Sequence, residues 1–347
     1  MARPDFRGQR IPGSHGEELT ADHPRVSIVI PNYNYARYLE ERFRSILGQT
    51  CQDYEIIFLD DASQDESVAL VRDKFGARVS GFEINSTNSG SPFKQWNRGV
   101  RLARGEFVWI AEADDTCTES FLEHMLNVLD RSPRIGLAYC CTMPIDEAGA
   151  VIDPAYFAWY VGELHPTRWH SDFVANGREE VRSYLSRKNT ITNVSGVVFR
   201  REAYVEMGYA PEHMRMCGDW LAYCRMLHDW DVAYLAKPMN FHRQHPAKQT
   251  HNAVLNLTYF REFLEVQRYL AETFDLGHHE RAAAFRRFVG EWDRLTVSHF
   301  GRIDMRNTLA LACMTAAYYR RPDECARIAA HFVRNATKSL RHAWKQN

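Results

Sequence analysis

The stretch that decides the fold is Val26-Ser27-Ile28-Val29-Ile30-Pro31, a nearly continuous apolar run rich in β-branched side chains. Such a run is typical of a strand buried on both faces of a parallel sheet. It leads into the turn residues Asn32-Tyr33-Asn34, and residues 36–49 then carry apolar side chains spaced as on one face of a helix. A second apolar run at 55–59 completes a strand, a helix and a strand, which predicts a right-handed βαβ unit.

The alternation of strands and helices continues to about residue 140. Apolar periodicity predicts further elements at 66–75, 79–84, 93–103, 106–110, 119–130 and 135–140. Thr116 and Glu119 have the spacing of a capping box, which predicts that a helix begins near residue 119. The pattern indicates an α/β domain whose mostly parallel sheet is flanked by helices.

The organisation changes after residue 140. Residues 144–169 are rich in aromatic side chains and lack periodicity, which predicts an irregular loop. Regular structure is predicted again at 194–207, from 219 onward and at 232–235, and helical periodicity dominates from residue 253. We therefore expect three parts: a disordered lead-in at 1–24, an α/β domain at 25–250 and a helical C-terminal extension at 251–347.

Composition excludes several classes of protein. The chain has 347 residues and a formal net charge of −1, so it has no overall positive field to hold nucleic acid. Its eight cysteines form no CxxC pair, which argues against a structural zinc site or a disulfide scaffold and favours reduced thiols in a cytoplasmic protein. We also expect no membrane-spanning helix and no secretory signal, because the long apolar runs that these need are absent from the sequence.

Acidic side chains follow two of the predicted strands. Asp60-Asp61 comes directly after the second strand, and Glu112-Ala113-Asp114-Asp115 follows the strand at 106–110. Ligands of open α/β sheets bind beyond the carboxyl ends of the strands, where these acids should meet. Clustered carboxylates repel one another unless a cation lies among them, and Mg²⁺ or Mn²⁺ with a nucleotide diphosphate would fit. The alternative, that these acids only cap turns, is less favoured for two clusters than for one.

Five short motifs occur in order along this domain: Val26–Asn34, Asp60–Ser63, Asn88–Gly90, Ala103–Val108 and Glu112–Asp115. In order, spacing and flanking strands they resemble the family 2 glycosyltransferases, which have the GT-A fold. The resemblance covers about residues 26–130 and extends in weaker form to about 250. It implies a Rossmann-like, mixed and mostly parallel sheet at 25–250. It also implies inverting transfer of a sugar from a nucleotide-diphosphate sugar to an acceptor hydroxyl, as in polysaccharide biosynthesis.

The resemblance also implies roles for single residues. Pro31 and Tyr33 would line the pocket of the nucleotide base, and Asp61 would hydrogen-bond the edge of the base. Asp114 would face the ribose or the donor sugar, and Asp115 would bind the divalent metal, Mn²⁺ or Mg²⁺. These assignments predict a donor site at the carboxyl ends of the first strands.

Other positions complete or depart from the family pattern. The first acid of the DxD-like signature is Glu112 here, which is longer by a methylene group and ranks below the two aspartates as a ligand. The segment Phe241–Pro246 resembles the family's Arg-x-His segment, so His245 would complete the metal shell and Arg243 would neutralise diphosphate charge. The alternative for His245 is a surface histidine in a loop.

The predicted general base is Asp219. The segment Cys217–Tyr223 resembles the family's acidic motif at the start of a helix, and an inverting transfer needs a base for the acceptor hydroxyl. Because a helix N-terminus stabilises a carboxylate, we expect Asp219 to be a weak base, with catalysis depending mainly on the leaving group and on positioning. The alternative is an N-cap aspartate without a chemical role.

Two segments are candidates for acceptor binding. Asn193–Gly196 is predicted to lie under the acceptor, and the aromatic stretch 156–169 would form an acceptor platform or lid. The acceptor implied by the resemblance is a saccharide or a lipid-linked saccharide. The alternative for the aromatic stretch is ordinary packing beneath a loop.

The chain ends in a basic amphipathic segment. From Arg327 onward there are five basic side chains and no acid, with apolar side chains at every fourth position. Such a helix can lie on an anionic membrane, which would place a cytoplasmic enzyme at the inner face of the membrane. The favoured alternative is a terminal helix whose apolar face packs on the core.

Three other functions compete with sugar transfer. A sugar nucleotidyltransferase or a dinucleotide oxidoreductase needs a glycine-rich phosphate loop after the first strand, and Pro31–Ala36 contains no glycine. A catalytically silent module that binds a sugar nucleotide or a glycan would not need the acids at 61, 114, 115 and 219. Sugar transfer is therefore the favoured prediction.

Overall fold

The computed structural model describes residues 23–245, 257–298 and 313–315. The predicted lead-in lies outside these residues except for its last two positions, and the basic C-terminal segment from Arg327 lies outside them altogether. Within the described residues, the seven cysteines are free thiols. No helix in these ranges has the length and apolar character that crossing a membrane requires.

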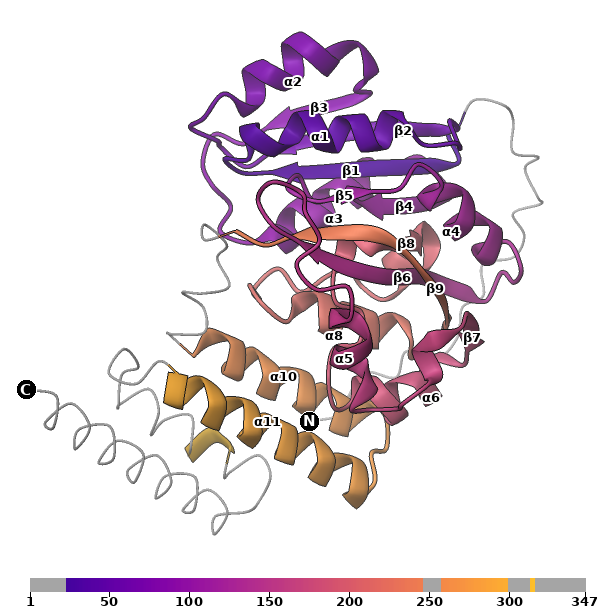
Figure 1. Ribbon diagram of the computed structural model, residues 1–347, viewed down its shortest axis with the longest axis vertical. Helices are drawn as coiled ribbons and strands as arrows, with labels where there is room; N and C mark the ends of the chain where they lie inside the picture. Colours follow the sequence, from indigo (N-terminus) through magenta and orange to yellow (C-terminus); the bar gives the residue numbers. More distant parts are fainter. Residues whose placement is uncertain (1–22, 246–256, 299–312, 316–347) are drawn as a thin grey trace, which may run out of the picture.

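The described chain forms one mixed sheet in the order β3-β2-β1-β4-β8-β6-β9-β5, with β7 paired to β9 (Figure 1). The first half of this sheet is parallel: β1 lies between β2 and β4, and β3 flanks β2. The bounds of these four strands are Val26–Asn32 for β1, Tyr54–Asp60 for β2, Gly81–Ile84 for β3 and Phe107–Ile110 for β4. The predicted βαβ unit and parallel sheet are confirmed.

Alternating side chains of the strands build two cores, one on each face of the sheet. Ile28, Ile56 and Trp109 point into one core, whereas Val29 and Ile57 point into the other. Both sets of side chains are buried. This explains why the sequences of these strands are continuously apolar and do not alternate between apolar and polar residues.

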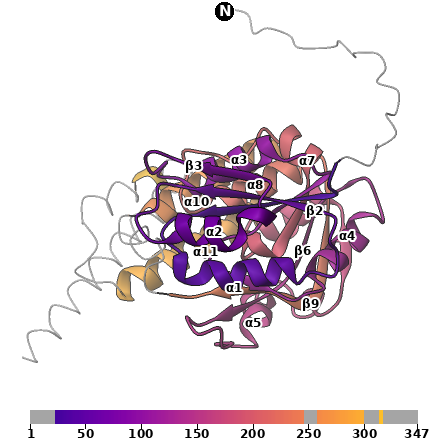
Figure 2. The ribbon, with the colours of Figure 1, turned by 90° about the horizontal axis from the view of Figure 1, so that it is seen from above.

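Helices cover both faces of the sheet (Figure 2). One core contains apolar side chains of α1 (Ala36–Leu47), α2 (Ser67–Phe75) and α4 (Phe121–Leu129). The other contains side chains of α3 (Pro92–Leu102) and α8 (Gly218–Met226). Gly99 of α3 permits close packing, because a Cβ there would lie 2.2 Å from a methyl group of Val29.

The second half of the sheet is largely antiparallel. β8 (Val197–Arg200) runs antiparallel to β4 and β6, and β9 (Asp231–Arg243) pairs in parallel with β6 (Ile135–Ile145). Both β6 and β9 are longer than the apolar patterns predicted. β9 continues through Phe241–Arg243, which the sequence placed after the strand. Two short strands, β5 (Thr116–Cys117) and β7 (Phe173–Ala175), also pair with β9.

Two local predictions were wrong. Thr116 lies in β5, not at a helix cap, and α4 begins after Ser120, so Thr116 and Glu119 form no capping box. The aromatic stretch 144–169 is not wholly irregular, because it contains the end of β6 and the helix α5 (Tyr156–Gly162). The remaining short elements are α6 (Gly177–Glu180), the π-helical turn η3 (Val181–Leu185) and α7 (Arg201–Glu206).

Two C-terminal helices follow the sheet. They are α10 (Thr258–Thr273) and α11 (His278–Ser298), which lie side by side below the sheet (Figure 1). Of these, α10 packs on α8 and α11 packs on α10. Phe263 of α10 joins the same core as α8 and packs edge to face on Trp220 at 5.0 Å between ring centres. The predicted C-terminal helices are therefore present, and they share a core with the α/β sheet.

Candidate active site

The loops after β1 and β2 hold each other in place at the carboxyl edge of the sheet. Asn32 donates to Asp60 at 2.7 Å, and the amide of Gln64 donates to Asn34 at 2.7 Å. Asn34 and Ala62 adopt left-handed backbone angles, with φ of 58° and 66°, which the cross-linked turns impose. Asp60 is buried within this framework, so the second acid of the pair is the one that lies beyond the strand end.

Asp61 is surrounded by hydrogen-bond donors from the segment that leads into α3. Its Oδ1 accepts from Asn85, from the amide of Ser89 and from Gln95, at 2.6 to 2.9 Å. Its Oδ2 accepts from the Ser89 hydroxyl at 2.8 Å. Asp61 is therefore oriented by protein donors, and Oδ2 retains acceptor capacity for a ligand such as a base N–H.

Pro31 and Tyr33 lie at the end of β1 beside this carboxylate. Pro31 is buried in register with Leu59 of β2, whereas Tyr33 is 37% exposed. The structure therefore brings both residues to the same edge as Asp61, with the Tyr33 ring accessible to a ligand.

Asp115, after β4, accepts hydrogen bonds on both of its carboxylate oxygens. Its Oδ2 accepts from Asn193 at 2.9 Å and from Ser195 at 2.7 Å, and its Oδ1 accepts from the amide of Arg243 at 3.0 Å. The carboxylate thereby joins three segments of the chain around a buried position. Asn193 and Ser195, which the sequence placed under the acceptor, serve here as donors to Asp115.

Asp114 lies beside His245. The Nε2 atom of His245 is 3.0 Å from Asp114 Oδ2, and the imidazole ring contacts Tyr35 and Tyr38 with ring centres 5.4 and 5.5 Å away. His245 is buried, and within the described residues its Nδ1 atom has no hydrogen-bond partner. The predicted association of His245 with the acids is thus present, but through Asp114 and not through Asp115.

Arg243 is buried, and its guanidinium is hydrogen-bonded to protein oxygens. Its Nε donates to the carbonyl of Asp114 at 2.8 Å, its Nη1 to the carbonyls of Asp146 and Glu147, and its Nη2 to Glu41 at 2.6 Å. The side chain is 1% exposed, so its donors are directed to protein acceptors. This differs from the expectation that Arg243 neutralises a diphosphate. The guanidinium instead fixes the backbone carbonyl of Asp114.

Glu112 occupies an apolar and acidic environment. It accepts a hydrogen bond from the Trp96 indole at 2.7 Å, while its amide donates to Ser195 at 3.1 Å. Burial first, and the nearby charge of Asp114 second, raise the pKa of Glu112 to about 8. This shift favours the protonated form of Glu112 near neutral pH, which makes it a weaker metal ligand than an ionised aspartate.

Asp219 lies in the first turn of α8, as the sequence predicted. The preceding residue, Gly218, permits close packing of α8 on α3, because a Cβ there would lie 2.4 Å from the Phe93 ring of α3. Asp219 Oδ2 accepts from Asn189 at 3.0 Å, and Oδ1 accepts from the Trp220 amide at 2.7 Å. The carboxyl thus contacts the segment that carries Asn189.

The expected weak basicity of Asp219 was wrong. Burial raises the pKa of Asp219 to about 7, and the donors Asn189 and Trp220 offset only part of this shift. Desolvation therefore outweighs the favourable helix N-terminus, which the sequence argument had taken as decisive. An aspartate with this pKa can accept a proton near neutral pH.

The predicted residues fall into two connected groups. Asp114, Asp115, Arg243 and His245 are joined by direct hydrogen bonds, whereas Asp61 is held by the loop before α3. Asp219 has no direct bond to the described members of either group. Ser91 links the second group to the loop before α8 by donating to the carbonyl of residue 214 at 2.9 Å.

Shared neighbours bring Asp219 close to the acids after β4. The hydroxyl of Tyr223 is buried, and its pKa is raised first by this burial and then by the charges of Asp219, Tyr204 and Glu112. Packed side chains connect the two positions: a Cβ at Gly218 would lie 2.4 Å from the Phe93 ring, Phe93 packs on Trp96 with ring centres 4.8 Å apart, and the Trp96 indole donates to Glu112 at 2.7 Å. The distribution fits a site bounded by the carboxyl edge of the sheet and the start of α8.

Several contributors were missed by the sequence analysis. Asn189 and Trp96 donate to the acids, and Tyr35 packs on His245. None of the three belongs to a motif, and their roles depend on distant segments. The one available signal was the polar segment Asn88–Gly90, which includes a donor to Asp61.

The fold and the acids at its carboxyl edge define a GT-A glycosyltransferase architecture. The sequence model of glycosyl transferase family 2 matches residues 27–204, which include the acids at 61 and 112–115. The chain belongs to glycosyl transferase family 2 and is an enzyme of that family.

Curated relatives share part of the chain. An uncharacterized glycosyltransferase of Nostoc sp. is 32% identical over 135 residues, which are 38% of this chain and 40% of that protein. Poly(ribitol-phosphate) β-N-acetylglucosaminyltransferase TarS of Staphylococcus aureus is 32% identical over 111 residues, 30% of this chain and 19% of that protein. The match thus spans less than half the length of these relatives.

Solved structures resemble the whole described fold. The S. aureus TarS fragment 1–349 in complex with UDP has a TM-score of 0.62 at 15% identity, covering 93% of this chain and 91% of that one. The mannosyltransferase PcManGT of Pyrobaculum calidifontis in complex with GDP-Man and Mn²⁺ has a TM-score of 0.54 at 17% identity, covering 91% and 88%. These likenesses confirm the predicted fold, including helices after the sheet.

Proposed function

We propose that this enzyme transfers a sugar, with inversion, from a nucleotide-diphosphate sugar to an acceptor hydroxyl. The observation that carries the proposal is the packing of the Asp219 turn, through Phe93 and Trp96, against the acids that follow β4. Burial also raises the pKa of Asp219 to about 7. Two structural relatives support the donor class: a TarS structure holds UDP-GlcNAc, and the PcManGT structure holds GDP-Man with Mn²⁺.

Donor binding is assigned to the carboxyl edge of the parallel half of the sheet. Asp61 accepts an N–H of the nucleotide base through its Oδ2 atom, whose partner Oδ1 is already fixed by three protein donors. Pro31 and the exposed ring of Tyr33 form the adjoining wall of the base pocket. The framework of Asn32, Asp60 and their loops keeps this wall rigid before the donor arrives.

The residues beside Asp114 fit a divalent metal. Asp114 offers a carboxylate and His245 an imidazole at 3.0 Å, and the buried Nδ1 atom of His245 has no partner among the described residues. Among the described residues, no group of three or more His, Cys, Asp or Glu side chains could hold a metal ion by itself. That agrees with Mg²⁺ or Mn²⁺, which are commonly held by one or two protein groups together with substrate phosphates.

We therefore move the proposed metal ligand from Asp115 to Asp114. Asp115 already accepts hydrogen bonds on both oxygens, whereas Asp114 and His245 face each other. A bound Mg²⁺ or Mn²⁺ would supply positive charge to a diphosphate leaving group. Arg243 holds the backbone carbonyl of Asp114, and Asp115 in turn accepts from the backbone amide of Arg243.

Asp219 is the proposed general base. Its carboxylate takes the proton of the acceptor hydroxyl while the acceptor oxygen forms a bond to the anomeric carbon from the face opposite the leaving group. The bond between the anomeric carbon and the diphosphate oxygen breaks, and the nucleoside diphosphate leaves with that electron pair. Asn189 orients the carboxylate through its 3.0 Å hydrogen bond.

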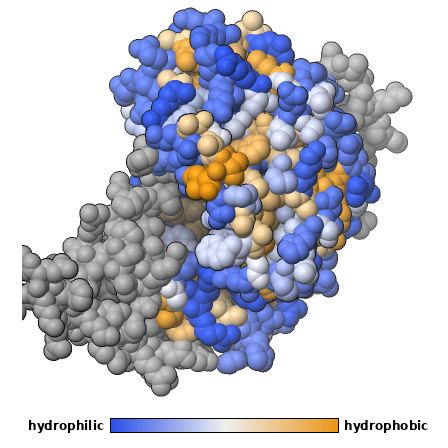
Figure 3. Space-filling model, in the orientation of Figure 1, coloured by the Kyte–Doolittle hydropathy of each residue, from blue (hydrophilic) through white to orange (hydrophobic). Residues whose placement is uncertain are grey.

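The acceptor is proposed to be a saccharide that approaches across α5. Trp159 is 71% exposed on this helix, and the neighbouring Tyr160 donates to the carbonyl of Asn189 at 3.0 Å. α5 therefore rests on the segment that contacts Asp219, and an exposed indole suits the C–H face of a sugar ring. Figure 3 shows a largely hydrophilic face with apolar groups gathered across its middle.

Calorimetry with a panel of nucleotide sugars, with and without Mn²⁺, tests donor binding in the full chain, and release of nucleoside diphosphate measures transfer. Asp219→Asn should keep donor affinity and lower the transfer rate about 10²- to 10⁴-fold, the range of a lost general base. Asp229→Asn is the matched control, because Asp229 is 69% exposed on the loop after α8.

Three outcomes are distinct. Donor binding with transfer that requires Asp219 supports the proposal. A variant Asp219→Asn that transfers sugar at the wild-type rate removes Asp219 as the base. Binding without transfer in the wild-type chain, over a panel of saccharide and lipid-linked acceptors, would favour a silent binding module.

A further inference from the structure

Glu262 of α10 is buried against the loop that leads into α8. Its Oε1 accepts from the amide of Arg215, and its Oε2 accepts from the amides of Met216 and Cys217, each at 2.8 Å. Only 7% of its surface is exposed. A buried carboxylate that satisfies three consecutive amides fixes the backbone of this loop, because those amides have no equivalent partner if it is removed.

This loop ends at the residue we assign as the base. Residues 215–217 are followed directly by Gly218 and Asp219 at the start of α8. Phe263, the neighbour of Glu262, packs on the Trp220 ring at 5.0 Å. α10 therefore holds both the loop before Asp219 and the side chain after it.

A second connection runs from α11 to the other side of Asp219. Arg287 of α11 bonds Glu163 at 2.6 Å, and Glu163 in turn bonds Lys188 at 2.6 Å. Lys188 precedes Asn189, whose side-chain Nδ2 atom donates to Asp219 Oδ2 at 3.0 Å. Both C-terminal helices thus contact segments that set the position of this carboxylate.

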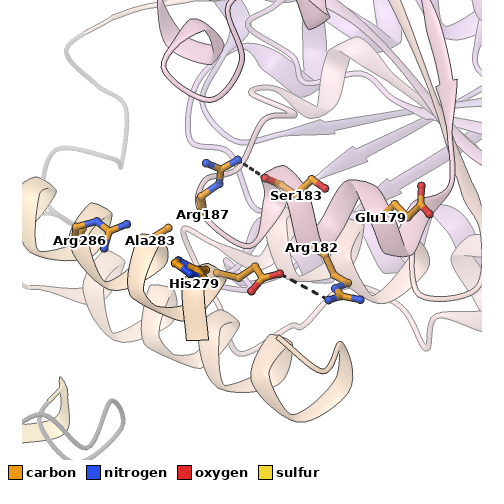
Figure 4. A pocket seen from close by; sticks show the side chains of 8 residues that line it. Glu179, Arg182, Ser183, Arg187, His279, Ala283 and Arg286 are labelled. Carbon is orange, nitrogen blue, oxygen red and sulfur yellow. Dashed lines mark hydrogen bonds and ion pairs between the residues drawn. The ribbon is translucent and has the colours of Figure 1, made fainter. Parts of the chain in front are cut away.

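The ion pair between α11 and η3 is too exposed to have this effect. A pocket of about 560 Å³ separates α11 from η3, and the ion pair between Arg182 and Glu280 crosses it at 3.7 Å (Figure 4). Exposed pairs of this kind contribute about 0–1 kcal/mol. Glu262 differs from this exposed pair, because its carboxylate is buried and bonds the backbone directly before Asp219.

We propose that Glu262 is a positioning residue for sugar transfer, through which the C-terminal helices orient Asp219 without forming part of the donor site. This inference rests on the proposed function of Asp219 as the base. The donor residues Pro31, Tyr33 and Asp61 belong to other elements. The hydrogen bond from Ser91 to this loop reaches the carbonyl of Met214, not the amides that Glu262 holds, so Glu262 should affect turnover and not donor affinity.

The charge of Glu262 gives the proposal a specific signature. Burial is the main cause of the raised pKa of Asp219, and the negative charge of Glu262 adds to it. Neutralising Glu262 should therefore lower that pKa. The other ionisable groups that interact with the Asp219 charge are the phenols of Tyr160 and Tyr223 and the thiols of Cys217 and Cys224.

The test compares Glu262→Gln with Glu265→Gln in the full chain. Glu265 lies on the same helix but forms an exposed pair with His213 at 2.7 Å, so its substitution is the matched control. Glu262→Gln should lower kcat about 10- to 100-fold, since small displacements of a reacting group are costly. Affinity for UDP and GDP with Mn²⁺ should stay within about twofold, and the pH midpoint of kcat/KM should move to lower pH.

Hydrogen exchange provides a readout that does not depend on turnover. The amides of residues 215–217 should exchange faster in Glu262→Gln than in Glu265→Gln. Glu262→Asp, which keeps the charge and shortens the side chain, should lower kcat without moving the pH midpoint, and it replaces the Gln variant if that chain does not fold. Unchanged exchange at 215–217, or an equal loss of nucleotide affinity and kcat, would overturn the inference. A wild-type chain that transfers no sugar would instead refute the proposed function.

Discussion

Asp115 follows β4 and Asp219 lies in the first turn of α8, and the surroundings of these two aspartates differ. Asp115 accepts hydrogen bonds from Asn193, Ser195 and the amide of Arg243. Asp219 accepts from one side chain, Asn189, and from the amide of the residue that follows it. The first carboxylate is embedded in donors, whereas the second is desolvated with few of them.

The difference separates a structural acid from a reactive one. Donors that are satisfied by a carboxylate stabilise its charge and tie segments together, which suits a residue that organises a site. Desolvation with few donors raises a pKa toward neutrality, which suits a residue that exchanges a proton. By this reasoning, Asp115 organises the metal position and Asp219 reacts.

The largest expected effect follows from removing Asp115. Asp115→Ala leaves Asn193, Ser195 and the Arg243 amide without their acceptor, and each unsatisfied buried group costs about 1–3 kcal/mol. The free energy of unfolding should therefore fall by about 3 kcal/mol or more, measured by urea denaturation. Asp219→Asn, the control, should change it by less than about 1 kcal/mol at pH 7. A fully stable Asp115→Ala chain that fails to bind the donor with Mn²⁺ would return the metal role to Asp115.

The next effect concerns pH. Asp219 must be ionised to accept a proton, and its pKa is raised to about 7, so kcat/KM should rise about tenfold per pH unit below pH 7 and level off above it. Because the folded-state pKa is raised above the unfolded value, the stability contributed by protonated Asp219 should be lost as the pH rises through 7. Both trends are measurable on the wild-type chain, by kinetics and by denaturation.

Asn189→Ala tests whether the few donors around Asp219 set its pKa. Removing a donor to the ionised carboxylate should raise the pKa of Asp219 further and move the midpoint of kcat/KM to higher pH. Glu265→Gln, which alters an exposed pair on α10, should leave the midpoint where it is. A midpoint that moves down, or stays in place in Asn189→Ala, would show that another group controls the profile.

The sequence predicted what local patterns determine. The strands at 26–31 and 55–59, the helix between them and the acids at their ends follow from apolar periodicity and turn chemistry, and these are present. Asp219 was also placed correctly at the start of a helix. Each of these features depends on neighbours within a few residues.

What the sequence could not predict depends on distant partners. The sign of the Asp219 pKa shift was wrong, because burial beneath α5 and α10 is not visible in a helix-start motif. Arg243 was assigned to a diphosphate, since its four protein acceptors lie far away in the chain. Likewise, the choice between Asp114 and Asp115 depends on which oxygen meets His245 and which meets Asn193.

The smallest expected effect lies on the acceptor side. Trp159 is 71% exposed on α5, so its ring contributes little to the fold and is available to a sugar face. Trp159→Ala should raise the KM for the acceptor about two- to tenfold, the equivalent of 0.5–1.5 kcal/mol for an aromatic contact, with kcat and donor affinity unchanged. Trp159→Phe keeps a ring and should recover most of the difference. If the acceptor KM is the same in all three chains, the acceptor does not cross α5. The residues assigned to the reaction around Asp219 would then be Asn189 and Asp219 alone, without Trp159.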